Sequence, residues 1–153
     1  MMKNEKQKKN ARALASTLCH LLFPLHRLPA MPLNHELPDY TYILRAADGY
    51  SAKVNDRVLQ ASFLLAPNQL VEAWNPDDPN ALSPEDMAPL LAMNPELILL
   101  GTGERQAFPA AAVMAACLTR GVGIEVMGNA AAARTFNVLA AEGRRVVAGF
   151  ILG

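Results

Sequence analysis

The residues best suited to bind a ligand form a short glycine-rich run, Gly101-Thr102-Gly103, directly after an apolar segment. The two glycines would let the backbone approach a ligand closely, and Thr102 could offer both its hydroxyl and its amide to an anion. The run has no third glycine at the spacing of the dinucleotide fingerprint, and the chain has no P-loop Gly-Lys-Ser/Thr sequence. The pattern therefore indicates either a general anion site or a sharp structural turn.

Arg134 and Asn137 are a second pair with binding chemistry. They lie three positions apart in a segment expected to be helical, so they share one face of the helix. If that face turns toward Gly101, the guanidinium of Arg134 can bind a carboxylate or phosphate and Asn137 can orient it. The alternative is a structural tether to backbone carbonyls or to a carboxylate such as Glu104 or Glu125.

Groups for catalysis or for metal binding are sparse. All three histidines precede residue 36, so the rest of the chain has no imidazole for general-base work. Cys19 and Cys117 are far apart, and Cys117 lies among alanines, which is typical of a buried, inert thiol. The acidic pairs at 77–78 and 85–86 occupy loop and helix-start positions. We therefore predict no catalytic residue, no metal site and no cofactor, and we favour a protein that is not an enzyme.

In the second half of the chain, strands and helices alternate. Apolar runs at 96–100 and 122–127 predict strands buried on both faces, and 144–152 predicts a last strand. Helices are expected from Ser83-Pro84 to about 94, from Pro109 to about 120, and from a capping Asn129 to Gly143. Strands joined by short crossover helices pair in parallel, and ligands bind beyond their carboxyl ends, where the Gly101 run lies.

The first half of the chain is predicted to be mostly β. Residues 40–45 and 50–54 flank Asp48-Gly49, a hairpin pattern in which glycine allows a positive φ. Further strands are expected over 57–66, with a bulge or break, and over 70–74. The predicted fold is an α/β domain of three layers, with a central mixed, largely parallel sheet, crossover helices and an additional N-terminal β layer.

Composition limits the class of protein. The 153 residues are 52% hydrophobic, with 14 basic and 14 acidic residues, which suits one globular domain and disfavours disorder or a nucleic-acid binder. No run reaches the roughly 18 apolar residues of a membrane span. Six basic residues and one acidic residue fall within 1–30, which leaves eight basic and thirteen acidic residues for the remainder.

This charge pattern predicts a basic leader over residues 1–36 and one domain over 37–153. The leader is interpreted as a flexible tail or as a mis-set start, with Met31 as the first residue. A targeting sequence, or an arm that touches nucleic acid or membrane, is the alternative. The expected location is the cytoplasm of a bacterium, or the mitochondrial matrix if the leader is a presequence.

Three ordered motifs resemble the domain of unknown function 498 family. They are Asn94-Pro95-Glu96-Leu97-Ile98-Leu99-Leu100-Gly101-Thr102-Gly103, then Met127-Gly128-Asn129-Ala130-Ala131-Ala132-Ala133-Arg134-Thr135-Phe136-Asn137-Val138-Leu139, then Glu142-Gly143-Arg144-Arg145-Val146-Val147-Ala148. The family includes the mitochondrial respiratory complex I assembly factor 3 and many small bacterial proteins. The resemblance implies the three-layer fold, a final strand that can run antiparallel to its neighbours, and no established reaction. Gly101, Thr102, Gly103, Arg134 and Asn137 carry over as motif positions, and Ala133 stands where the family often has Cys.

Two functions remain open from the sequence. The first is a non-enzymatic interaction module that assists respiratory complex I assembly and binds a respiratory subunit or an assembly protein; it predicts Trp74, Phe108 or Met127 exposed in one patch. The second is a module that binds a small anion or nucleotide, with Gly101, Thr102, Gly103, Arg134 and Asn137 around a pocket. The oligomeric state is not predicted.

Overall fold

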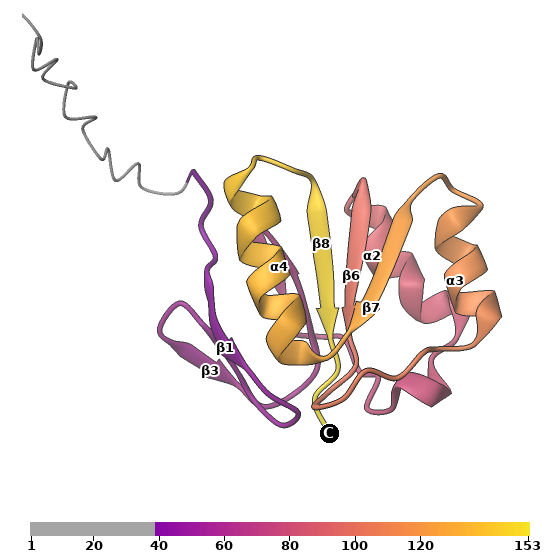
Figure 1. Cartoon of the computed structure of the whole chain (residues 1–153), viewed down its shortest axis with the longest axis horizontal. Helices are drawn as coiled ribbons and strands as arrows, with labels where there is room; N and C mark the ends of the chain where they lie inside the picture. The colour runs from indigo at the N-terminus through magenta and orange to yellow at the C-terminus, as the bar shows by residue number, and fades with distance from the viewer. Residues whose placement is uncertain (1–38) are drawn as a thin grey trace, which may run out of the picture. The chain divides into compact units, whose positions relative to one another are not determined.

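Two sheets and a set of short helices make up the part of the chain that the computed structural model describes, residues 39–153 (Figure 1). The central sheet has the strand order β5-β4-β8-β6-β7, and a separate antiparallel sheet has the order β1-β2-β3. The leader predicted over 1–36 lies outside the described residues. The predicted mixed α/β class, with an additional β layer, is confirmed.

Apart from a short helix before Ser83 and the division of the strand expected over 57–66, the elements follow one another in the order expected from the sequence. The strands are β1 (Leu44–Ala47), β2 (Ala52–Val54), β3 (Arg57–Leu59), β4 (Phe63–Ala66), β5 (Gln69–Val71), β6 (Leu97–Gly101), β7 (Gly123–Met127) and β8 (Val146–Phe150). The helices are η1 (Pro79–Ala81), η2 (Pro84–Met87), α2 (Ala88–Ala92), α3 (Ala111–Leu118) and α4 (Asn129–Ala141). No helix within residues 39–153 has the length and apolar character needed to cross a bilayer.

The direction of the final strand differs between its two neighbours. β6 pairs in parallel with both β7 and β8, as the crossover helices α3 and α4 require. β8 pairs with β4 in the antiparallel direction. The antiparallel orientation implied by the family resemblance therefore holds for one side of β8 only.

The strand expected over 57–66 is two strands in different sheets. β3 belongs to the small sheet and β4 to the central sheet. At the break the buried hydroxyl of Ser62 donates to the carbonyl of Pro76 and accepts the N–H of Leu152. These two bonds satisfy polar groups where the strand ladder is interrupted.

Trp74 is a core residue, which corrects the prediction that it is exposed. The strand expected over 70–74 ends at Val71, and Trp74 folds back beyond it with only 4% of its surface exposed. Its indole N–H donates to the carbonyl of Asp86 (3.0 Å), and a β-carbon added to Gly149 would lie 2.9 Å from the ring. A glycine in β8 thus leaves the space that the indole fills.

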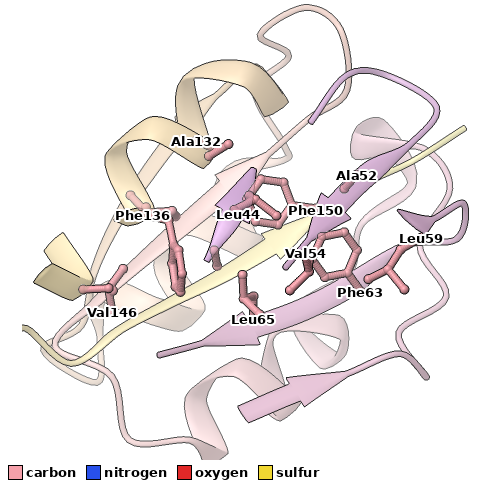
Figure 2. Packing of buried hydrophobic residues seen from close by; sticks show 14 of the residues in the cluster. Leu44, Ala52, Val54, Leu59, Phe63, Leu65, Ala132, Phe136, Val146 and Phe150 are labelled. Atoms are coloured by element: carbon pink, nitrogen blue, oxygen red, sulfur yellow. The ribbon is translucent and has the colours of Figure 1, made fainter. Parts of the chain in front are cut away.

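Alternate residues of the central sheet face two hydrophobic clusters. On one face, the small sheet and α4 pack against Phe63 and Phe150, as Figure 2 shows for Val54 and Phe136. The rings of Phe63 and Phe150 stack with their centroids 5.0 Å apart. On the other face, η2, α2 and α3 cover residues such as Ile98. The small sheet and α4 therefore form one outer layer, and η2, α2 and α3 form the other.

Candidate functional site

The carboxyl ends of β6, β7 and β8 meet at one rim of the domain, where the sequence placed the candidate site. Gly101-Thr102-Gly103 lies at the end of β6, as predicted. The tip of the β1–β2 hairpin reaches the same rim, because the carbonyl of Gly49 accepts the N–H of Gly153 beyond β8 (3.0 Å). Segments that are far apart in the sequence therefore build this rim together (Figure 1).

The side chain of Asn129 connects three of these segments. It is fully buried, and its Oδ1 accepts the N–H of Gly103 (3.1 Å). Its Nδ2 donates to the carbonyls of Asp48 (2.7 Å) and Ile151 (2.8 Å). One amide side chain thus joins the loop after β6, the hairpin tip and the chain after β8.

The sequence pattern predicted a different role for Asn129, as the cap of a helix, and that interpretation is wrong. Gly128 is the N-cap residue of α4, and Asn129 is the first helical residue. From this position its side chain reaches the strand ends, where one N–H and two carbonyls lie within bonding distance. No local pattern signals this role, because the three bonded segments converge only in the folded chain.

Two glycines at the rim are required by close packing. A β-carbon at Gly101 would overlap the Asn129 side chain and approach the Phe150 ring at 3.0 Å. A β-carbon at Gly49 would lie 3.1 Å from the backbone nitrogen of Glu104. Gly49 does not have the positive φ expected from the hairpin pattern, so the neighbouring loop is what excludes a side chain there.

Thr102 closes the loop that follows β6. Its hydroxyl donates to the carbonyl of Arg105 (2.9 Å) and accepts the N–H of Ala107 (3.0 Å), while its own N–H donates to Met127 (3.0 Å). The side chain is buried. The hydroxyl and the amide that the sequence offered to an anion are therefore bonded within the protein.

Asn137 holds the small sheet to α4. Its side-chain amide accepts the N–H of Leu44 (3.0 Å) and donates to the carbonyl of the same residue (2.7 Å), as a neighbouring strand would. Arg134, one turn earlier on α4, is exposed, and neither ion pair found within residues 39–153 includes it. The structure thus joins the Gly101 loop to Asn129, while Asn137 bonds to β1; a ligand shared by Arg134 and the loop stays a prediction.

Two titratable groups in the described part of the chain have shifted pKa values. The backbone N–H groups of Tyr50 (2.8 Å) and Ser51 (2.7 Å) donate to the Asp48 carboxylate and lower its pKa below 3.8. These bonds fix the hairpin tip at the rim. Burial raises the pKa of the Cys117 thiol, and the charge of Arg120 opposes this shift more weakly. Cys117 is buried in the cluster under α3, as predicted for an inert thiol.

The exposed side chains near the rim include two aromatic residues. Tyr50 at the hairpin tip is 70% exposed, and Phe108 in the loop after β6 is 67% exposed. Met127 is half-buried. Within residues 39–153, no three His, Cys, Asp or Glu residues are grouped closely enough to hold a metal ion.

A shallow groove of about 360 Å³ lies between the consecutive helices η2 and α2 on one side and α3 on the other. Its lining residues are Pro84, Glu85, Ala88, Leu91, Ala116, Thr119 and Arg120. None of the residues predicted to bind a ligand lines this groove.

Comparisons with known proteins identify relatives of this chain. A family model described as a protein of unknown function (DUF498/DUF598) matches residues 44–151. The solution structure of XCC1710 from Xanthomonas campestris is 63% identical, with a TM-score of 0.69, and the match covers 80% of this chain and 93% of that one. A solution structure from Bordetella pertussis, described as an Mth938-like domain, is 31% identical with a TM-score of 0.61, covering 72% and 85% of the two chains.

A curated relative carries a name that mentions a membrane. The "13 kDa major membrane protein" of Francisella tularensis subsp. holarctica (strain LVS) is 32% identical over 85 residues. The match covers 55% of this chain and 69% of the relative. The names of these relatives do not include a reaction, a ligand or a partner.

Proposed function

Because the chain belongs to the DUF498/DUF598 family of proteins of unknown function, we propose that it is a non-enzymatic interaction module that assists the assembly of a membrane-bound respiratory complex, complex I. Its partner is a subunit or an assembly protein of that complex. The partner binds at the rim formed by the carboxyl ends of β6, β7 and β8, with Tyr50 and Phe108 as its main contacts.

The main support for this proposal is the difference between the polar and the aromatic side chains at the rim. The polar side chains of Thr102 and Asn129 point inward and are bonded to the backbone, whereas the large aromatic side chains of Tyr50 and Phe108 are exposed. Aromatic residues are enriched at protein interfaces, where a few of them supply most of the binding energy. A small-molecule site would instead need polar groups that are free to meet the ligand.

Hydrogen bonds from buried side chains also fix the backbone of the rim. Asn129 bonds to three segments, and Thr102 holds the loop through Ala107. A surface that is already fixed before binding loses less conformational entropy when a partner binds. The membrane named in the Francisella relative supports a partner in a membrane-bound complex.

Affinity capture from native cells tests the proposal. The full chain is used to capture proteins from detergent-solubilised membranes, and respiratory subunits are quantified by mass spectrometry. Tyr50→Ala together with Phe108→Ala should reduce their recovery by about tenfold or more, as expected when interface hot spots are truncated. Leu118→Ala removes a side chain that is also exposed (58%) but lies on α3, and it should leave recovery unchanged.

Two results would overturn the proposal. One is a wild-type capture in which no respiratory subunit is enriched over a bead control. The other is equal recovery of those subunits by the Tyr50/Phe108 double variant and by Leu118→Ala, because the rim would then not be the contact surface.

A further inference from the structure

Charged residues are distributed unequally between the two outer layers of the domain. The layer formed by β1–β3 and α4 contains four basic residues and no acidic residue within the bounds of its elements; these are Arg45, Lys53, Arg57 and Arg134. In the other layer, η2 carries Glu85 and Asp86. Residues 39–153 contain twelve acidic and eight basic residues, so elements without an acidic residue run against the overall composition. The acidic residues of the layer formed by β1–β3 and α4, Asp48, Asp56 and Glu142, lie in the turns beside its elements.

The outer face of the small sheet presents one cation between aliphatic groups. Lys53 of β2 pairs with Ala46 of β1 and with Val58 of β3, and all three are exposed. Their neighbours Ala52 and Val54 point inward and are buried. Because side chains alternate along a strand, the row from Ala46 through Lys53 to Val58 faces solvent.

The exposed residues of α4 lie beside the outer face of the small sheet. Arg134 and Val138 are exposed and four positions apart, while Ala133 and Phe136 face the core. Asn137 bonds to Leu44, which places α4 directly beside β1 (Figure 1). Arg134 lies one turn earlier on the same side of the helix, next to β1. The outer face of the small sheet and the exposed stripe of α4 therefore lie side by side.

The basic face is defined by Lys53, Val58, Arg134 and Val138, and Arg45 is exposed beside it where the register of β1 shifts. Val58 is 61% exposed and Val138 is 57% exposed. The two ion pairs found within residues 39–153, Arg57–Glu72 and Arg144–Glu96, leave Lys53 and Arg134 out. The acidic residues nearest to Lys53 along the chain, Asp48 and Asp56, lie in the turns at the ends of β2. Glu142 follows α4, one turn after Val138.

We propose that the basic face binds the anionic phospholipid surface of a membrane. Cations close to such a surface are attracted by its negative potential, and exposed aliphatic side chains beside them can enter the headgroup region. The observation that selects lipid over another polyanion is the pair of exposed valines among the cations, because nucleic-acid surfaces are bound mainly through phosphate contacts. This surface is separate from the rim, so the inference does not depend on the proposed partner.

Vesicle binding by the full chain tests the inference. Sedimentation is measured with vesicles of phosphatidylglycerol and phosphatidylethanolamine, and with phosphatidylcholine vesicles as the neutral comparison. Lys53→Gln with Arg134→Gln should weaken binding to anionic vesicles by about tenfold or more, since each basic residue near the surface contributes substantially. Binding should also fall as salt is raised.

A matched control removes the same charge elsewhere. Arg120→Gln with Arg145→Gln neutralises two exposed arginines outside the basic face and should change binding by less than about twofold. The basic residues within 1–30 are present in every variant, so any contribution they make to vesicle binding is the same in all of them. Melting temperatures of both double variants confirm that the fold is intact.

Three results would overturn the inference. Equal losses in the two double variants would show that only net charge matters, and equal binding of wild type to anionic and neutral vesicles would exclude recognition of charge. Unchanged vesicle binding by Lys53→Gln with Arg134→Gln would show that the basic face is not the surface that contacts lipid. Capture of respiratory subunits by the Tyr50/Phe108 surface is measured separately and can fail or succeed independently.

Discussion

The side-chain amide of Asn129 occupies the space that a β-carbon on Gly101 would need. Gly101 ends β6, and Asn129 begins α4. The close approach lets the Asn129 amide reach Gly103, Asp48 and Ile151 at once. The glycine at the end of the strand and the asparagine at the start of the helix therefore work as one structural unit.

Gly101→Ala should destabilise the domain by about 1–3 kcal/mol, the usual cost of adding a methyl group to a packed site. The added carbon would displace the Asn129 amide and press on the Phe150 ring. Urea unfolding measures the loss. Gly123→Ala is the matched control, because its β-carbon would press only on the flexible end of Leu97, with the carbonyl of Glu96 at an ordinary contact distance of 3.8 Å, and should cost less. An equal effect of the two substitutions would contradict the argument.

Asn129→Ala should lower the free energy of unfolding by about 2–4 kcal/mol, because the N–H of Gly103, the carbonyl of Asp48 and the buried carbonyl of Ile151 all lose their partner. Differential scanning calorimetry measures the change. Asn80→Ala removes an exposed amide that bonds only to Asp78, and it should be nearly neutral. If Asn129→Ala were also neutral, the rim would not depend on this side chain.

Asn137→Ala should loosen the attachment of β1 to α4. The N–H and the carbonyl of Leu44 both lose the Asn137 amide, so the Leu44 amide should exchange with solvent faster, with a stability loss of about 1–2 kcal/mol. Hydrogen exchange followed by NMR resolves this site. Asn68→Ala removes contacts to Thr41 and should leave exchange at Leu44 unchanged. Faster exchange at Leu44 in both variants would point to a general loss of stability.

The parts of the fold that could be predicted are those specified by local pattern. The apolar run ending at Gly101 predicted β6, and the Ser83-Pro84 start and the break between 57 and 66 also appear in the structure. The role of Asn129 and the burial of Trp74 could not be predicted, because both depend on residues far away in sequence that meet only after folding. The basic face likewise depends on the pairing of β1 with α4, which no short segment encodes.

Asp48→Asn should make stability less dependent on pH in the acid range. Because the folded state lowers the pKa of Asp48 below 3.8, its carboxylate stabilises the fold above that pH and loses this effect as the pH falls through the folded pKa. Urea midpoints of wild type and variant, measured from about pH 6 down to about pH 2, should differ most at the upper end, and the difference should shrink as the pH falls through the folded pKa. A constant difference across this range would show that the carboxylate has no role in the hairpin tip.

Arg134→Ala should not alter the response of the protein to small anions. The amide of Gly103 and the hydroxyl of Thr102 are already bonded to Asn129 and Arg105, so the loop keeps neither group free for a ligand. Thermal shifts of wild type and variant are compared against phosphates, nucleotides and small carboxylates; a ligand at a hundred times its dissociation constant would stabilise its site by about 2.7 kcal/mol. A shift in wild type that disappears in Arg134→Ala would establish an anion site and would favour ligand binding over the interaction module.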